Sequence, residues 1–130
     1  MNPLALQGLN ILVVDDDPRV RGLYAMVLRE AGATVTASGA ATEAVQLADL
    51  HVPDVVVTDL GMPGHDGVWL LQELKRRMQA LPVIVVTGGL EGLGRDDLLN
   101  LGFAETLRKP MVLSHLAATV ARVVGRADST

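Results

Sequence analysis

Strand-like and helix-like patterns alternate along this chain, and that alternation constrains the fold more than any other feature of the sequence. Short apolar runs bounded by turn residues predict strands over 9–14, 34–37, 54–58, 83–86 and 104–107. Each run is followed by apolar residues at the spacing of an amphipathic helix. The consecutive valines at 55–57 are typical of a strand covered on both faces, which predicts the central strand. The pattern indicates an α/β fold: a single doubly wound (βα)5 three-layer sandwich around a parallel five-stranded sheet.

Proline, glycine and aspartate mark several expected helix boundaries. Pro18 suits the first turn of the first helix, and Asp17 before it is interpreted as a cap rather than as a metal ligand. Asp96 is predicted to cap the fourth helix, which Gly102 ends. Pro110 is predicted to start the last helix.

Length and composition indicate one soluble domain. The 130 residues include no cysteine, which excludes disulfides and thiolate metal sites. No apolar run reaches the roughly 18 residues of a membrane helix, and the first residues lack the positive charge of a signal peptide, so a cytoplasmic protein is expected. A net charge of −4 and three aromatic residues make neither nucleic acid nor membrane an expected partner. We predict an N-terminal extension over 1–8, a domain over 9–125, and a polar tail or linker stub over 126–130.

Chemically active side chains stand at the ends of four predicted strands. Asp15 and Asp16 follow the first strand and Asp59 ends the third, whereas Thr87 and Lys109 follow the fourth and fifth. Parallel strands bring their carboxyl ends to one edge of the sheet, where ligands bind in open α/β folds. Each residue alone has an ordinary explanation as a turn, cap or solvated residue. Such residues have no structural reason to converge, so together they predict a functional site.

The residue types in this set suit a phosphoryl group. Ionised carboxylates held about 4–6 Å apart repel one another unless a cation neutralises them. Mg²⁺ prefers oxygen ligands and is typically held by one or two carboxylates with phosphate oxygens, and Mn²⁺ is an alternative. An aspartate can accept a phosphoryl group as an acyl phosphate when a metal, an ammonium group and a hydroxyl donor surround it. The sequence therefore predicts a metal-assisted phosphoacceptor site.

From residue 9 to about 124 the chain resembles the response-regulator receiver domains of two-component signalling. The resemblance rests on ILVVDDDPRVR, EAVQLADLHVPDVVVTDLGMPGHDG, VIVVTG and the closing Lys109-Pro110. It implies a flavodoxin-like fold with strand order 2-1-3-4-5. It also implies a signalling phosphoacceptor in a two-component system or phosphorelay, with no enzymatic activity beyond self-catalysed phosphorylation and dephosphorylation. The implied partners are a histidine kinase or histidine phosphotransfer protein, a downstream protein or output domain, and in some cases a second copy of the chain.

The resemblance also implies a role for each site residue. Asp59 would accept the phosphoryl group, Thr87 would be the switch hydroxyl, and Lys109 would pair with the carboxylate and the phosphoryl oxygens. The implied metal ligands are Asp15, Asp16, Asp59 and the backbone carbonyl of Gly61. Gly88, next to Thr87, would leave the site open to water, which predicts a phosphorylated state that is not unusually long-lived.

One position departs from the family pattern. Thr106 stands where receiver domains usually carry a tyrosine or phenylalanine that moves inward on phosphorylation. Threonine is smaller and stiff at χ1, so the relay to the face of the fourth helix, fifth strand and fifth helix is in question. The glycine-rich stretch 88–94 is interpreted either as a compensating segment that rearranges or as a flexible surface loop. Arg19 and Arg21 are interpreted as surface arginines or as contacts to a kinase.

Two other function classes fit parts of the sequence. A receiver-like interaction module would keep the fold without phosphorylation, and Thr106 is the feature that favours it. A haloacid dehalogenase-like phosphatase would use Asp15 as its nucleophile. The motif of that class is Asp-x-Asp-x-Thr or Val, and Arg19 stands at its fifth position in this chain. In addition, no cap domain would fit within the chain, and Asp59 would have no role.

Overall fold

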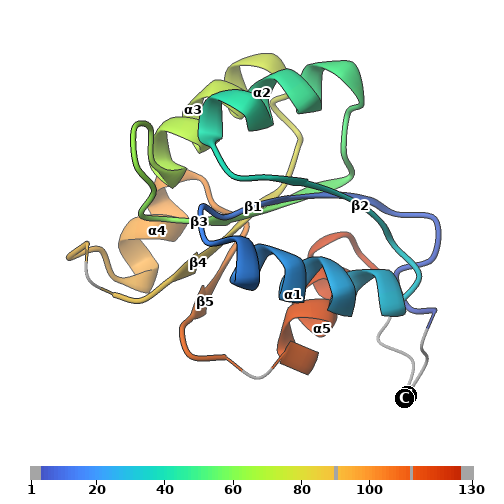
Figure 1. The fold of residues 1–130 in the computed structure, drawn as a ribbon. Helices are drawn as coiled ribbons and strands as arrows, with labels where there is room; N and C mark the ends of the chain where they lie inside the picture. Colours follow the sequence, from blue (N-terminus) through green and yellow to red (C-terminus); the bar gives the residue numbers. More distant parts are fainter. Residues whose placement is uncertain (1–3, 90, 112, 127–130) are drawn as a thin grey trace.

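A computed structural model describes residues 4–89, 91–111 and 113–126. Among these residues, five strands form one parallel sheet in the order β2-β1-β3-β4-β5 (Figure 1). The strands are β1 (Asn10–Val14), β2 (Thr34–Ser38), β3 (Val55–Asp59), β4 (Val83–Thr87) and β5 (Glu105–Arg108). The predicted α/β class, the parallel sheet and the strand order implied by the resemblance are confirmed.

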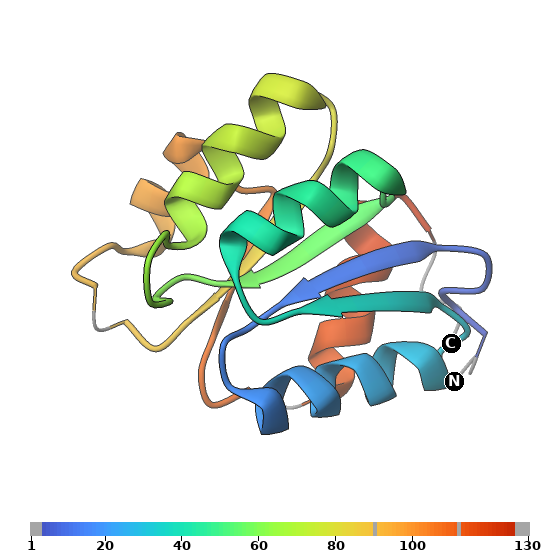
Figure 2. The ribbon, with the colours of Figure 1, turned by 45° about the horizontal axis from the view of Figure 1, so that its top comes forward.

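Helices cover both faces of this sheet and complete the three layers. On one face lie α1 (Pro18–Glu30) and α5 (Leu113–Val123), and on the other lie α2 (Ala41–Leu50), α3 (Gly67–Arg77) and α4 (Arg95–Leu101) (Figures 1 and 2). None of the helices in the described ranges is long and apolar enough to cross a membrane.

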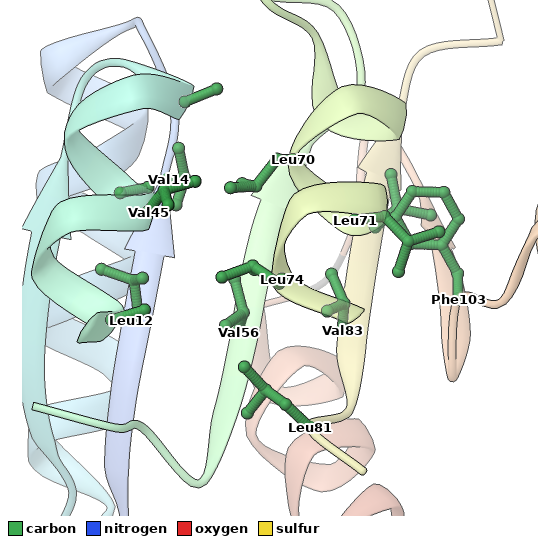
Figure 3. Packing of buried hydrophobic residues seen from close by; sticks show 14 of the residues in the cluster. Leu12, Val14, Val45, Val56, Leu70, Leu71, Leu74, Leu81, Val83 and Phe103 are labelled. Atoms are coloured by element: carbon green, nitrogen blue, oxygen red, sulfur yellow. The ribbon is translucent and has the colours of Figure 1, made fainter. Parts of the chain in front are cut away.

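The sheet divides the apolar core into two clusters because successive strand side chains point to opposite faces. Leu12, Val56 and Val83 pack against the α2–α3 side. Figure 3 shows Val56 and Val83 beside Leu74 of α3, and Leu12 on the side of Val45 of α2. The intervening residues of the same strands pack against α1 and α5. The middle of β3 is completely buried, in agreement with its prediction as the central strand. This arrangement holds the end of β3 in a fixed position at the carboxyl edge.

Local side-chain chemistry explains where the helices begin. The carboxylate of Asp17 accepts a hydrogen bond from the amide of Arg19 at 2.9 Å, which confirms Asp17 as the cap of α1. Asp66 caps α3 in the same way through the amide of Trp69 at 2.9 Å. Gly102 ends α4 in the left-handed conformation with φ of +118°, as predicted.

Two predicted helix starts are wrong. Asp96 lies within the first turn of α4, and the cap position is Gly94, whose amide donates to the carboxylate of Asp97 at 2.9 Å. Either aspartate favours a helix N-terminus electrostatically, so the sequence alone does not identify the cap. The last helix begins at Leu113 rather than at Pro110, which lies in the preceding loop. Proline suits a loop as well as a first helical turn, because it lacks the N–H donor.

The segment before β1 packs against the rest of the domain. Leu6 is fully buried in the α1–α5 cluster, and its amide donates to the carbonyl of Ala31 at 2.8 Å. Arg126, just beyond α5, donates to the backbone carbonyl of Gln7. Residues 1–3 and 127–130 of the predicted extension and tail lie outside the described residues. The domain boundaries stay predictions.

Candidate functional site

Three acidic side chains gather at the carboxyl edge of the sheet. β1 and β3 are neighbours with Val14 opposite Thr58, so the residues that follow, Asp15 and Asp59, lie next to each other. Asp16 joins them, and one carboxylate oxygen from each residue lies within 4.8 Å of the other two. Asp15 is buried, Asp59 is partly buried, and Asp16 is exposed to solvent. The cluster is therefore open to solvent on one side and enclosed on the other.

Asp15 is the carboxylate of this cluster whose surroundings best suit a cation. Its side chain is 2% exposed, and its Oδ1 accepts the amide N–H of Asp17 at 2.9 Å. Its buried Oδ2 has no hydrogen-bond partner among the described residues and lies 4.0 Å from Lys109 Nζ. Burial raises the pKa of Asp15, the Asp17 amide opposes the rise, and the charge of Asp59 adds to it. An orphaned oxygen beside two further carboxylates fits a divalent cation such as Mg²⁺.

Asp59 is held by two donors on one of its oxygens. Asp59 Oδ1 accepts the amide of Leu60 at 2.9 Å and Lys109 Nζ at 3.2 Å. Burial raises the pKa of Asp59, although the hydrogen bond from Lys109 opposes the rise. Burial lowers the pKa of Lys109, but the hydrogen bond and charge of Asp59 outweigh it and the net direction is upward. Lys109 is therefore a fixed ammonium group at this carboxylate.

Strand pairing brings Lys109 to the site. Its backbone amide donates to the carbonyl of Thr87 at 2.9 Å, which extends the β4–β5 ladder by one residue. The ammonium group then reaches across β4 to Asp59 on β3. The predicted residues at the ends of β1, β3, β4 and β5 thus lie along one edge of the sheet, and Asp15, Asp59 and Lys109 are in direct contact.

Thr87 is almost fully buried, at 6% exposure, and its hydroxyl is already engaged. Thr87 Oγ1 accepts the amide of Gly89 at 3.0 Å and donates to Glu91 Oε1 at 3.0 Å. The other oxygen of Glu91 stands against Gly61, where an added Cβ atom would lie only 2.6 Å from it. Glu91 could not be identified from the sequence alone, because residues of a glycine-rich loop show no periodicity. Its spacing of four residues from Thr87 was the only available signal.

Arg21 contributes to the site from α1. Its Nη1 donates to the backbone carbonyl of Asp15 at 2.9 Å, and the amide of Asp15 donates to the carbonyl of Ser38 at 3.1 Å. A Cβ atom at Gly39 would lie 2.7 Å from this Nη1, so the missing side chain leaves room for the guanidinium group. Neither of the earlier interpretations of Arg21 included this contact. Together the two hydrogen bonds connect the backbone of Asp15 to α1 and to the end of β2.

An ion-pair network surrounds Thr106, the position at which receiver domains usually carry an aromatic ring. Glu105 of β5 pairs with Arg95 of α4 and with Arg122 of α5, the latter at 3.2 Å. Arg95 also donates to the hydroxyl of Thr106 at 3.3 Å. The hydrogen bond from Arg95 lowers the pKa of Glu105. Thr106 is half-buried and is linked to α4 by polar contacts rather than by aromatic packing.

Comparison with known families and proteins agrees with this geometry. The response regulator receiver domain matches residues 11–121. The transcriptional regulatory protein FixJ of Azorhizobium caulinodans is 36% identical over 123 residues, which cover 92% of this chain and 57% of FixJ. The DNA-binding transcriptional regulator NtrC of Escherichia coli K12 is 32% identical over 114 residues, which cover 88% of this chain and 24% of NtrC. An uncharacterised 14.6 kDa protein of Leptolyngbya boryana is 36% identical over 108 residues, which cover 82% of each chain.

Solved structures give the same result. The receiver domain of the Francisella response regulator 1452 superposes with a TM-score of 0.81 at 28% identity, covering 90% of this chain and 97% of that one. A response regulator receiver domain protein from Clostridium thermocellum also has a TM-score of 0.81 at 28% identity, covering 89% and 94% of the two chains. The chain spans about a quarter of NtrC and just over half of FixJ, so the similarity concerns one domain of each regulator.

Proposed function

This chain belongs to the response regulator receiver domain family, and from that premise we propose that it accepts a phosphoryl group on Asp59. The donor would be the phosphohistidine of a histidine kinase or of a histidine phosphotransfer protein. The observation that carries the proposal is the contact of Lys109 Nζ with Asp59 Oδ1 at 3.2 Å, beside the orphaned Oδ2 of Asp15. Neither feature would be needed if these residues served only as helix caps or solvated side chains.

The proposed transfer exchanges one bond to phosphorus for another. A carboxylate oxygen of Asp59 attacks phosphorus, the bond between phosphorus and the imidazole nitrogen breaks, and its electron pair returns to the imidazole. The product is an acyl phosphate on Asp59. Lys109 holds the carboxylate in place before the reaction and offers an ammonium group to the added oxygens afterwards.

A divalent cation completes the proposed site. The residues that would hold Mg²⁺, or Mn²⁺ in its place, are Asp15, Asp16, Asp59 and the backbone carbonyl of Gly61. When bound, the ion supplies positive charge against the developing charge on the phosphoryl oxygens. The orphaned oxygen of Asp15 and the close spacing of the three carboxylates support this assignment.

Thr87 is the proposed switch hydroxyl, and the α4-β5-α5 face is the proposed output surface. A phosphoryl oxygen at Asp59 would accept a hydrogen bond from the Thr87 hydroxyl, and the change would pass through the β4–α4 loop to a downstream protein, an output domain or a second copy of the chain. An added Cβ at Gly88 would meet no atom within 4 Å, which supports open access for water. We therefore expect self-catalysed hydrolysis and a phosphorylated state that is not unusually long-lived, and a lifetime of days would contradict this expectation.

Incubation with acetyl phosphate and Mg²⁺ tests the acceptor assignment. Intact-mass measurement should show the addition of one phosphoryl group to the wild-type chain and none to Asp59→Asn. Asp54→Asn is the matched control, because Asp54 lies just before the same strand at its opposite end and accepts the amide of Asn10 at 2.7 Å. Asp54→Asn should be phosphorylated like the wild type. Phosphorylation of Asp59→Asn at the wild-type level would refute the assignment.

The same experiment separates the two other function classes. A receiver-like interaction module predicts no phosphorylation of any variant. A haloacid dehalogenase-like phosphatase predicts that Asp15→Asn loses the modification while Asp59→Asn retains it. The nearly complete burial of Asp15 disfavours the second class, because a nucleophile must reach its substrate.

A further inference from the structure

Glu91 places a carboxylate where the proposed phosphoryl group must find its hydroxyl donor. Thr87 Oγ1 donates to Glu91 Oε1 at 3.0 Å, and Glu91 Oε2 lies against Gly61, two residues beyond Asp59. We propose that Glu91 is a positioning residue that competes with the phosphoryl group for the Thr87 hydroxyl and so weakens phosphoryl binding in the resting domain. This inference rests on the proposed phosphoacceptor function of Asp59.

The competition follows from the single proton of a hydroxyl group. Thr87 Oγ1 already accepts the amide of Gly89 at 3.0 Å, and its one proton is directed to Glu91. A phosphoryl oxygen can accept this hydrogen bond only after the hydroxyl has turned away from Glu91. Thr87 itself is 6% exposed, whereas Glu91 reaches it from the solvent-exposed loop. The two anions are therefore mutually exclusive partners of one donor.

Electrostatic repulsion acts in the same direction. Glu91 adds a fourth carboxylate to the edge that already holds Asp15, Asp16 and Asp59. A carboxylate there disfavours an incoming anion but favours a divalent cation. Removal of the Glu91 charge should therefore strengthen the binding of a phosphoryl mimic without strengthening the binding of Mg²⁺. General destabilisation of the fold would weaken both.

Release of Glu91 also offers a route to the output face that does not need an aromatic ring. Gly89 and Gly92 flank Glu91 with φ of +82° and +75°, so the resting turn depends on two positive-φ glycines. This loop leads directly to Gly94 at the start of α4, and Arg95 of α4 donates to Thr106. A change at Glu91 would thus reach Thr106 through the polar contacts of this chain.

Beryllium trifluoride, a phosphoryl mimic, tests the proposal in the presence of saturating Mg²⁺. Calorimetric titration should show about tenfold tighter binding to Glu91→Ala than to the wild type, equivalent to about 1.4 kcal/mol. Glu91→Gln should show a smaller gain, because it keeps an acceptor oxygen and loses only the charge. Glu30→Gln, an equal charge change at the exposed end of α1, should leave the affinity unchanged. A separate Mg²⁺ titration should show no increase in affinity for either Glu91 variant.

A double-mutant cycle determines whether Glu91 acts through the hydroxyl. In a Thr87→Val background the gain from Glu91→Ala should shrink to the part that is due to charge alone. Binding of the mimic to the wild type with no gain in either Glu91 variant would overturn this inference and leave the acceptor assignment intact. An undiminished gain in the Thr87→Val background would also overturn it. If the wild type neither binds the mimic nor becomes phosphorylated, the proposed function fails and this inference fails with it.

Discussion

Replacement of Asp15 by asparagine should stabilise the metal-free protein. Asp15 is a buried carboxylate with one oxygen that no hydrogen-bond donor among the described residues satisfies. Burial raises its pKa, which means that the fold disfavours the charged form relative to the unfolded chain. Asparagine has nearly the same shape, keeps an acceptor for the amide of Asp17, and carries no charge. The site would thus lose binding capacity and the fold would gain stability.

The structure gives the size of this effect. Asp16 is exposed, so solvent screens its repulsion of Asp15. At an effective dielectric constant of about 20, repulsion from Asp59, whose carboxylate lies within 4.8 Å, is at least about 3.5 kcal/mol, and attraction across the 4.0 Å to Lys109 is about 4 kcal/mol. These two contributions nearly cancel, so the cost of burying the carboxylate remains. We expect a gain of about 1–2 kcal/mol in the free energy of unfolding, since one oxygen keeps its hydrogen bond. For a domain of 130 residues this corresponds to a rise in Tm of about 4–8 °C.

Thermal denaturation in EDTA and in Mg²⁺ measures the effect. In EDTA, Asp15→Asn should melt above the wild type, whereas the matched charge control Glu30→Gln should melt with it. Mg²⁺ at ten times its Kd should stabilise the wild type by about 1.4 kcal/mol, and it should stabilise Asp15→Asn by less. The difference in Tm should therefore narrow or reverse when Mg²⁺ is added.

A specific result would refute this reasoning. If Asp15→Asn melts at or below the wild type in EDTA, the buried carboxylate is not a source of instability, and the attraction to Lys109 outweighs its burial. If Mg²⁺ raises the Tm of both proteins equally, Asp15 is not a ligand of the ion.

Three further predictions concern the surroundings of the site. The hydrogen bond from Arg95 lowers the pKa of Glu105, so this pairing stabilises the fold fully at pH values above the ordinary pKa of 4.5. The stabilisation is lost as the pH falls through the lowered pKa. Glu105→Gln should accordingly flatten the acid limb of a plot of unfolding free energy against pH. Arg21→Met and Gly39→Ala should each weaken Mg²⁺ binding about tenfold in a titration. Both changes disturb the hydrogen bond from the Arg21 guanidinium group to the backbone carbonyl of Asp15. An unchanged affinity in both would show that this contact does not position the ligands. Leu74→Ala, at a fully buried position of α3, should lower the free energy of unfolding in urea by about 2–5 kcal/mol.

The sequence predicted the layers and the edge where the site forms, because both follow from periodicity. The valines before Asp59 indicated a strand buried on both faces, and parallel pairing then brought Asp15 and Asp59 together. The strand order had a different origin. It was implied by the resemblance to a family, since a strand's own side-chain pattern does not identify its neighbour.

Side chains that reach across loops could not be predicted in the same way. Glu91 meets Thr87 only because the glycines beside it adopt positive φ angles, which the letters of a glycine-rich stretch do not specify. Arg21 looked like a surface arginine because the reach of a long side chain to a backbone carbonyl leaves no periodic signal. The cap of α4 at Gly94 was missed because the adjacent aspartates favour several positions equally.

The hydrogen bond between Arg126 and the carbonyl of Gln7 has a practical consequence for engineering. It joins the segment before β1 to the segment after α5 at the amino edge of the sheet, opposite the carboxylate cluster. A short peptide could therefore link these two segments, and new ends could be opened in an exposed loop, without moving any strand. The same arrangement would keep a reporter domain inserted at this junction away from an approaching phosphodonor.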